Sequence, residues 1–165
     1  MVKLLADIVS KNGNLLLSVP LRADGTFDEK EEKILNEFGD WMAINKEAIY
    51  DTRPWVVFGE GPIADSDIPL NAQGFNEGSY GKAGADEIRF TTKGNTLYAI
   101  ALAWPADGKV IVKSLAKGRK TAPCGNINKV ELLGYGKVKF NVNDGGLEVN
   151  LPEKLNDIAP VLKIY

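Results

Sequence analysis

The sequence contains no histidine and a single cysteine, Cys124, among its 165 residues. Without histidine, the chain by itself cannot build a Ser-His-Asp or Cys-His catalytic arrangement or an imidazole metal site. With one cysteine it cannot form an intrachain disulfide or a cysteine-based zinc site. We therefore expect no cofactor and no metal, and we interpret Cys124 as a small side chain in a loop or at the start of a strand.

Long apolar runs and an excess of positive charge are also absent. No window approaches the run of about 18 apolar residues that spans a membrane, and the start, MVKLLADIVSKNG, has no signal-peptide cleavage site. The net charge is −2, and residues 1–53 carry 7 basic and 10 acidic side chains. Because neither part has the basic excess that phosphates or anionic lipids attract, we expect no nucleic acid and no membrane among the partners. The compartment is left open.

The first 50 residues alternate between helical and strand patterns. Residues 2–12 place apolar side chains at helical spacing. Residues 15–21, LLLSVPL, are apolar at successive positions, which is typical of a buried strand in a parallel sheet. Thr26 and Glu29 form a capping box that predicts a second helix, to about Ile49. This is one unit of an α/β repeat, yet we find no flanking strands of the same kind.

From Arg53-Pro54 onward the pattern changes to short strands of period two with turns between them. Lys93-Gly94-Asn95 and Asp144-Gly145-Gly146 are hairpin turn signals. About eight short strands without a helical stretch predict an antiparallel β-sandwich. The predicted fold class is α+β, mainly β, with residues 1–52 forming a helix-strand-helix unit and residues 53–165 the sandwich.

Several long motifs add a family resemblance to this pattern. The motifs are DIVSKNGNLLL (7–17), DGT (24–26), EAIYDTRPW (47–55), GEGP (59–62), IRFTTKGNTLYAIALAWP (88–105), NKVELLG (128–134), GLEVNLP (146–152) and VLKIY (161–165). The first three resemble the end of the catalytic barrel in α-L-fucosidases of glycoside hydrolase family 29. The others resemble the C-terminal sandwich of that family. The resemblance spans nearly the whole chain.

The resemblance implies a (β/α)8-like barrel followed by a β-sandwich, in an enzyme that hydrolyses α-L-fucosides with retention. Retention uses two carboxylates about 5 Å apart. In the family the nucleophile is an aspartate well upstream of the matched motifs, and histidines bind the fucose hydroxyls. Neither the catalytic aspartate nor the fucose-binding histidines of the family have a counterpart in this chain, so we predict no catalytic residue here. The implied partners are an N-terminal catalytic barrel, from the same or a separate polypeptide, and a fucosylated glycan. Family members are often exported or lysosomal.

Four residues are candidates for substrate contact, each with a structural alternative. Ser18 stands where the family often has Asn, close to the C-terminal face on which barrel active sites lie. Glu60 lies between glycines that let a backbone approach closely, which a turn also requires. Trp55 and Trp104 offer aromatic faces to a sugar, or fill the core or domain junction. In each case the structural role is the preferred interpretation.

Three functions remain open for the chain. It is the C-terminal part of a fucosidase, inactive alone and serving a structural or accessory role, or a stand-alone carbohydrate-binding module, or one half of a split fucosidase. The sequence itself predicts exposed apolar surface along residues 1–50, which could drive self-association. Leu15–Val19 must accordingly be left exposed, pair with the sandwich, or be covered by a second copy.

Overall fold

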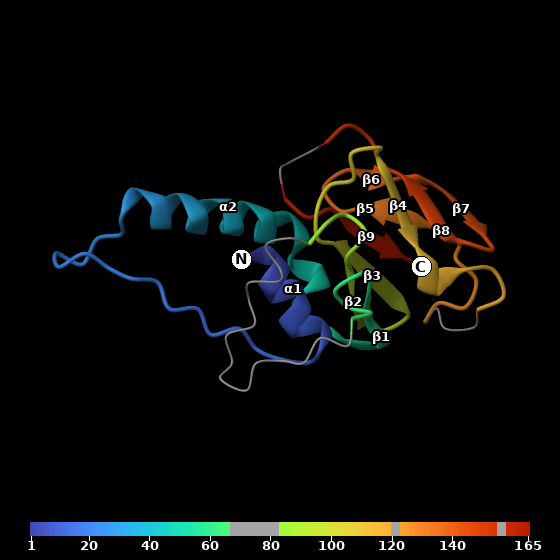
Figure 1. Ribbon diagram of the computed structural model, residues 1–165, viewed down its shortest axis with the longest axis horizontal. Helices are drawn as coiled ribbons and strands as arrows, with labels where there is room; N and C mark the ends of the chain where they lie inside the picture. The colour runs from blue at the N-terminus through green and yellow to red at the C-terminus, as the bar shows by residue number, and fades with distance from the viewer. Residues whose placement is uncertain (67–82, 120–122, 155–157) are drawn as a thin grey trace.

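The computed structural model describes residues 1–66, 83–119, 123–154 and 158–165. Two sheets pack face to face, and helices lie against the outer side of the larger one (Figure 1). The larger sheet has the order β1 (Arg53–Glu60), β2 (Ile88–Lys93), β3 (Thr96–Ala101), β9 (Val161–Ile164), β5 (Val130–Leu132) and β6 (Gly136–Lys137). The smaller has the order β4 (Lys109–Val112), β8 (Gly146–Asn150) and β7 (Lys139–Asn143). Each pair of neighbouring described strands is antiparallel, which confirms the predicted sandwich.

The period-two pattern divides the larger sheet into two faces, each with its own core. Phe90, Leu97 and Ile164 point toward the smaller sheet and pack with Val112 and Val149. The alternate residues of the larger sheet face the helices. These include Tyr98, Ile100 and Val161, which pack with Val2, Leu5, Ala6 and Trp41 in a second apolar cluster. Because both faces are covered, β3 (TLYAIA) and β9 (VLKI) are apolar at most positions on both faces.

Three helical elements precede the sandwich, namely α1 (Val2–Ser10), α2 (Glu29–Asn45) and the 3-10 helix η1 (Lys46–Ala48). The predicted capping box is wrong: the N-cap of α2 is Asp28, whose carboxylate accepts from the amides of Lys30 and Glu31 at 2.8 and 3.4 Å. Thr26 cannot serve, because its amide and hydroxyl both donate to Asp24, at 3.0 and 2.7 Å. The α-helix also ends at Asn45, before the predicted Ile49, and tightens into η1.

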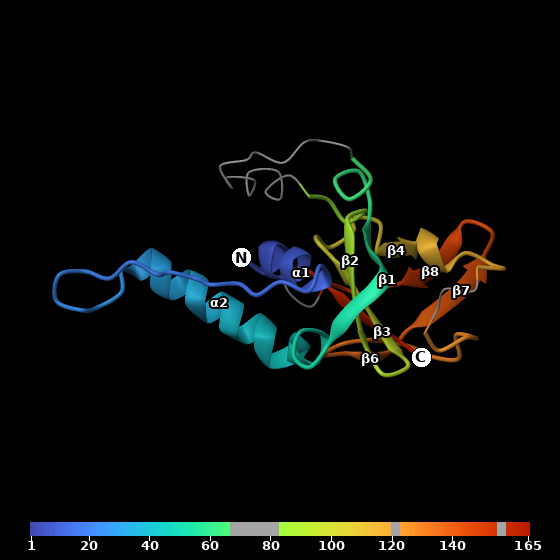
Figure 2. The same cartoon turned by 90° about the horizontal axis from the view of Figure 1, so that it is seen from below.

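The predicted strand at residues 15–21 is not formed. These residues lie in neither a helix nor a strand, and the exposed fractions of Leu16 and Leu21 are 95% and 58%. No described strand pairs with these residues, and the segment is left exposed. We call residues 13–38 the arm: its extended part runs out from the sandwich, and α2 returns along it (Figure 2).

The strand boundaries differ from the predicted ones where side chains intervene. The alternating run 109–115 splits into β4 and the 3-10 helix η3 (Lys113–Leu115), because the amides of Lys113 and Ser114 bind Glu60 instead of continuing the ladder. The predicted hairpins at Gly94 and Gly146 connect β2 to β3 and β7 to β8. Within the described residues, no helix is both long and apolar enough to cross a bilayer.

Candidate functional site

The GEGP motif lies where the end of β1 meets the start of η3. Glu60, the last residue of β1, is 7% exposed, and its carboxylate points toward the start of η3. It accepts from the amides of Lys113 and Ser114, at 2.7 and 2.9 Å, and from the Ser114 hydroxyl at 2.5 Å. Glu60 therefore ties the larger sheet to the segment that follows the smaller sheet's strand β4, and its carboxylate is engaged by the protein itself.

The two glycines of the motif leave room for the charged side chains of the neighbouring strand. A Cβ on Gly59 would lie 2.9 Å from Cδ and 3.0 Å from Nη1 of Arg89. Gly61 has φ +125°, and a Cβ there would lie 2.5 Å from the carbonyl oxygen of Asp86 and 2.9 Å from Cα of Glu87. The glycines are thus required by close packing at the end of β1 and by backbone conformation at Gly61.

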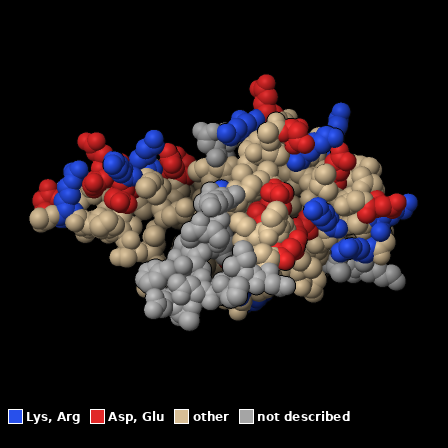
Figure 3. All heavy atoms as spheres, viewed as in Figure 1, with Lys and Arg blue, Asp and Glu red and all other residues tan. Residues whose placement is uncertain are grey.

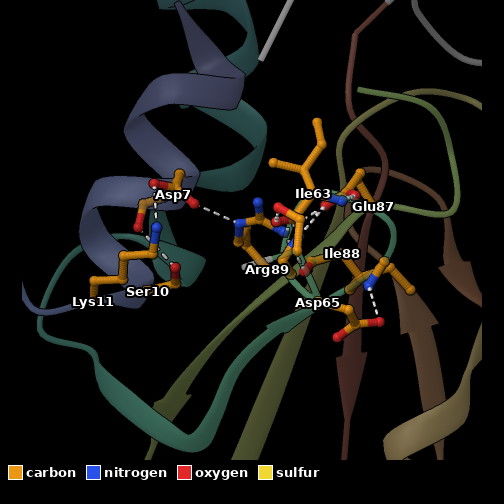
Figure 4. A network of polar contacts seen from close by, with 11 residues as sticks. Asp7, Ser10, Lys11, Ile63, Asp65, Glu87, Ile88 and Arg89 are labelled. Carbon is orange, nitrogen blue, oxygen red and sulfur yellow. Dashed lines mark hydrogen bonds and ion pairs between the residues drawn. The ribbon is translucent and has the colours of Figure 1, made fainter. Parts of the chain in front are cut away.

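Behind the motif lies a buried network of charges, which joins α1 to the sheet (Figure 4). Arg89 is 1% exposed; its Nε lies 2.6 Å from Asp7 Oδ1, and its Nη1 lies 2.9 Å from Glu87 Oε2. Lys11 Nζ adds a contact of 2.8 Å to the other Asp7 oxygen. Glu87 also accepts from the backbone amide of Ile63. Two carboxylates and two cations face one another, so the buried charge is compensated.

A groove of about 760 Å³ opens on the other side of α1, between that helix, the start of the arm and α2. Apolar side chains line part of it, namely Leu5, Val9, Leu15, Leu17, Phe38, Met42 and Ile49, and polar residues such as Asn12, Asp51 and Arg53 line the rest. The charged side chains of α2 gather along the upper edge of the arm, and the surface just below them is largely uncharged (Figure 3).

The four sequence candidates occupy different environments. Ser18 is exposed on the arm, whereas Glu60 lies at the junction described above. Trp55 is 7% exposed and packs edge-on against Phe90, with ring centroids 5.0 Å apart. Trp104 is half-buried against the same core. The structure does not gather the four around one site, and a substrate contact at any of them stays a prediction.

Asp7, Glu87 and Arg89 were not among the sequence candidates, although the sequence carries a signal for them. Asp7 interrupts the apolar run of the first helix on its buried side. Glu87 and Arg89 flank Ile88 at the start of β2 and are two residues apart, so in an extended chain they project to the same side. Opposite charges at such buried positions indicate pairing, because an isolated buried charge is costly.

Tyr98 gives the helix-facing side of the sheet a pH-dependent contact. It is 2% exposed, and its hydroxyl donates to Glu47 of η1 at 3.0 Å. Burial, with the Glu47 carboxylate beside it, raises the pKa of Tyr98 far above its usual 10.0. Because the pKa is raised in the folded state, the stabilisation is fully present below pH 10 and is lost as the pH rises above it.

We therefore expect the free energy of unfolding to fall between about pH 10 and pH 11, and Tyr98→Phe to remove part of that fall. Urea unfolding at a series of pH values from about 8 to 11 measures the slope. An unchanged slope in Tyr98→Phe would contradict this account.

Comparison with known proteins gives a consistent match along most of the chain. The family model "Alpha-L-fucosidase" matches residues 1–47, and "Alpha-L-fucosidase C-terminal domain" matches residues 83–165. An alpha-L-fucosidase of Branchiostoma floridae is 32% identical over 162 residues, covering 97% of this chain and 30% of the relative. The human plasma alpha-L-fucosidase is 29% identical over 155 residues, covering 93% of this chain and 28% of the relative.

Solved structures show the same similarity. A Thermotoga maritima alpha-L-fucosynthase, solved with a fucosyl disaccharide, has a TM-score of 0.67 and 28% identity, covering 99% of this chain and 32% of that protein. Alpha-L-fucosidase isoenzyme 1 from Paenibacillus thiaminolyticus has a TM-score of 0.64 and 25% identity, with 99% and 33% covered. The chain spans less than a third of the length of the curated relatives it matches.

Proposed function

Because this chain belongs to the α-L-fucosidase family, we propose that it is the C-terminal part of a retaining α-L-fucosidase-like glycoside hydrolase and has a structural, accessory role in it. In this proposal residues 1–52 complete a catalytic barrel, and residues 53–165 form a sandwich that braces it. The two carboxylates that hydrolyse the α-L-fucoside belong to the rest of the barrel, supplied by the same or a separate polypeptide.

The observation that carries this proposal is the exposure of the apolar side chains of the arm. Leu15–Val19 has apolar side chains on both faces, and Leu16 is 95% exposed. The exposed surface continues into the groove beside α1, whose wall includes Val9, Phe38 and Met42. A segment of this pattern is stable when strands flank it and helices cover it, as in a parallel barrel. The arm thus has the surface expected of a barrel strand and helix without their neighbours.

The test is hydrolysis of an aryl α-L-fucoside by the purified chain, alone and with a barrel polypeptide. The polypeptide is the part of the Branchiostoma floridae relative that the match to this chain does not cover. We expect no turnover by either polypeptide alone and turnover by the mixture. Turnover by this chain alone that survives repurification would contradict the accessory role.

A pair of variants makes the test specific to the arm. Leu16→Asp combined with Leu17→Asp should abolish the activity of the mixture, because both side chains would be buried between barrel strands and helices. Ile111→Asp is the matched control, since Ile111 is 48% exposed on the smaller sheet, and it should leave the activity unchanged. Equal activity in the arm variant and the control would show that the arm is not the barrel contact.

The same variants separate the proposal from two alternatives. A stand-alone carbohydrate-binding module should bind a fucosylated glycan in a titration whether or not the arm is changed. Self-association through residues 1–50 should appear as a larger species in sedimentation, which the double arm variant dissociates. Neither outcome requires the barrel polypeptide, so each is distinguishable from complementation.

A further inference from the structure

We propose that Arg89 is a positioning residue that fastens α1 to the sandwich, so that the sandwich sets the place and direction in which the arm leaves the body of the protein. The meaning of this coupling for a barrel rests on the function proposed above, but the coupling itself does not. Residues 1–47, which include α1, match the family model for the fucosidase itself. The buried side of α1, namely Val2, Leu5, Ala6, Asp7 and Ser10, nevertheless packs against the sandwich side of the molecule.

The guanidinium of Arg89 spans the space between the sheet and the helix. It lies 2.6 Å from Asp7 on α1 and 2.9 Å from Glu87 on its own side of the junction, and Arg89 is 1% exposed. Its Cζ lies 5.8 Å from the centre of the Phe58 ring, and Gly59 has no side chain that would displace it. Removing the guanidinium would leave the buried carboxylates of Asp7 and Glu87 without the cation that they share, and breaking a buried ion pair in this way is strongly destabilising.

The fixed position of α1 is passed on to the arm through the end of the helix. Asn12 adopts φ +66°, its amide donates to Val9 at 3.0 Å, and the amide of Gly13 donates to Ile8 at 2.8 Å. These bonds close the helix and turn the chain outward. A Cβ on Gly13 would lie 2.8 Å from the Ile8 side chain, so the turn is also tightly packed. The exit direction is therefore defined two residues before the apolar segment begins at Leu15.

The competing explanation is that the network only adds to the overall stability of the molecule. Val2, Leu5 and Ala6 also bury apolar surface against the sheet and could hold α1 without Arg89. The two accounts differ in which backbone amides lose their protection when Arg89 is replaced. If Arg89 is the fastener, its loss opens α1 locally while the centre of the larger sheet stays closed. If it is only one stabilising contact among many, α1 and the sheet lose protection together.

The test is amide hydrogen exchange of the full chain, followed by mass spectrometry, for Arg89→Met. This variant keeps much of the side-chain volume and removes the charge. We expect peptides covering residues 2–10 to exchange about a hundredfold faster, while peptides from β3 and β9 keep their protection. Arg89→Lys should keep part of the protection that Arg89→Met loses. It retains the positive charge but lacks the planar guanidinium that contacts both carboxylates.

Two further variants keep the proposal falsifiable if Arg89→Met does not fold. Asp7→Asn removes only the carboxylate on α1 and leaves the Arg89–Glu87 pair, so it should release α1 alone. Lys163→Met is the control, because it removes another cation of the larger sheet that pairs with Glu47, away from α1, and should leave residues 2–10 protected. Unchanged exchange in α1, or equal acceleration throughout the sheet, would overturn the proposal. Neither readout involves a fucoside or a barrel polypeptide, so its failure is distinct from failure of the proposed function.

Discussion

Gly61→Ala is expected to lower the free energy of unfolding by about 4 kcal/mol, from two costs that arise at the same atom. The first is conformational: φ is +125° at this position, which an L side chain rarely adopts. The second is steric: the new Cβ would lie 2.5 Å from the carbonyl oxygen of Asp86 and 2.9 Å from Cα of Glu87. Both contacts are to backbone, which cannot move aside as a flexible side chain can.

A matched glycine separates these two costs. Gly136, the first residue of β6, has φ +108°, and a Cβ there would meet nothing within 4 Å. Gly136→Ala should therefore lose only the conformational cost, about 2 kcal/mol. Urea unfolding of both variants beside the parent chain gives the comparison. Equal losses would show that the space around Gly61 is not limiting and that the junction tolerates a side chain.

The sandwich was predictable because its pattern is local. Alternation at period two records which face of a strand is buried, and the glycines at positions 94 and 146 mark turns whose backbone only glycine adopts easily. Boundaries were less predictable, because they depend on distant partners. The run 109–115 alternates to its end, yet the strand stops at Val112, since Glu60, from a strand about fifty residues earlier, takes the next two amides.

In the arm, by contrast, the sequence predicts a whole strand that does not form. The pattern LLLSVPL states correctly what surroundings the segment suits, namely apolar neighbours on both sides. It says nothing of whether those neighbours are present, and the described residues supply none, so the segment forms no strand. The buried network was missed for a related reason. Asp7 and Arg89 are 82 positions apart, and only the fold brings their side chains to 2.6 Å.

Glu60→Gln is expected to cost about 3 kcal/mol, although the side chain keeps its shape. Three donors converge on the two carboxylate oxygens, from the Lys113 amide, the Ser114 amide and the Ser114 hydroxyl. A glutamine replaces one of those oxygens by an NH₂ group, which directs its hydrogens at a backbone amide that also donates. One amide is then buried without an acceptor, and the contact between β1 and η3 is lost.

Glu148→Gln is the control, since Glu148 pairs with Lys109 at 2.9 Å on the exposed side of the smaller sheet, and it should change stability by less than about 1 kcal/mol. Unfolding in urea measures both variants, and the two should share the slope of the parent chain. A loss in Glu60→Gln no larger than in the control would show that the protein does not depend on this carboxylate. Glu60 would then again be a candidate for contact with a sugar, as the glycines on either side of it first suggested. A loss near 3 kcal/mol would mean that Glu60 and the glycines on either side of it have a structural role at the junction of the two sheets.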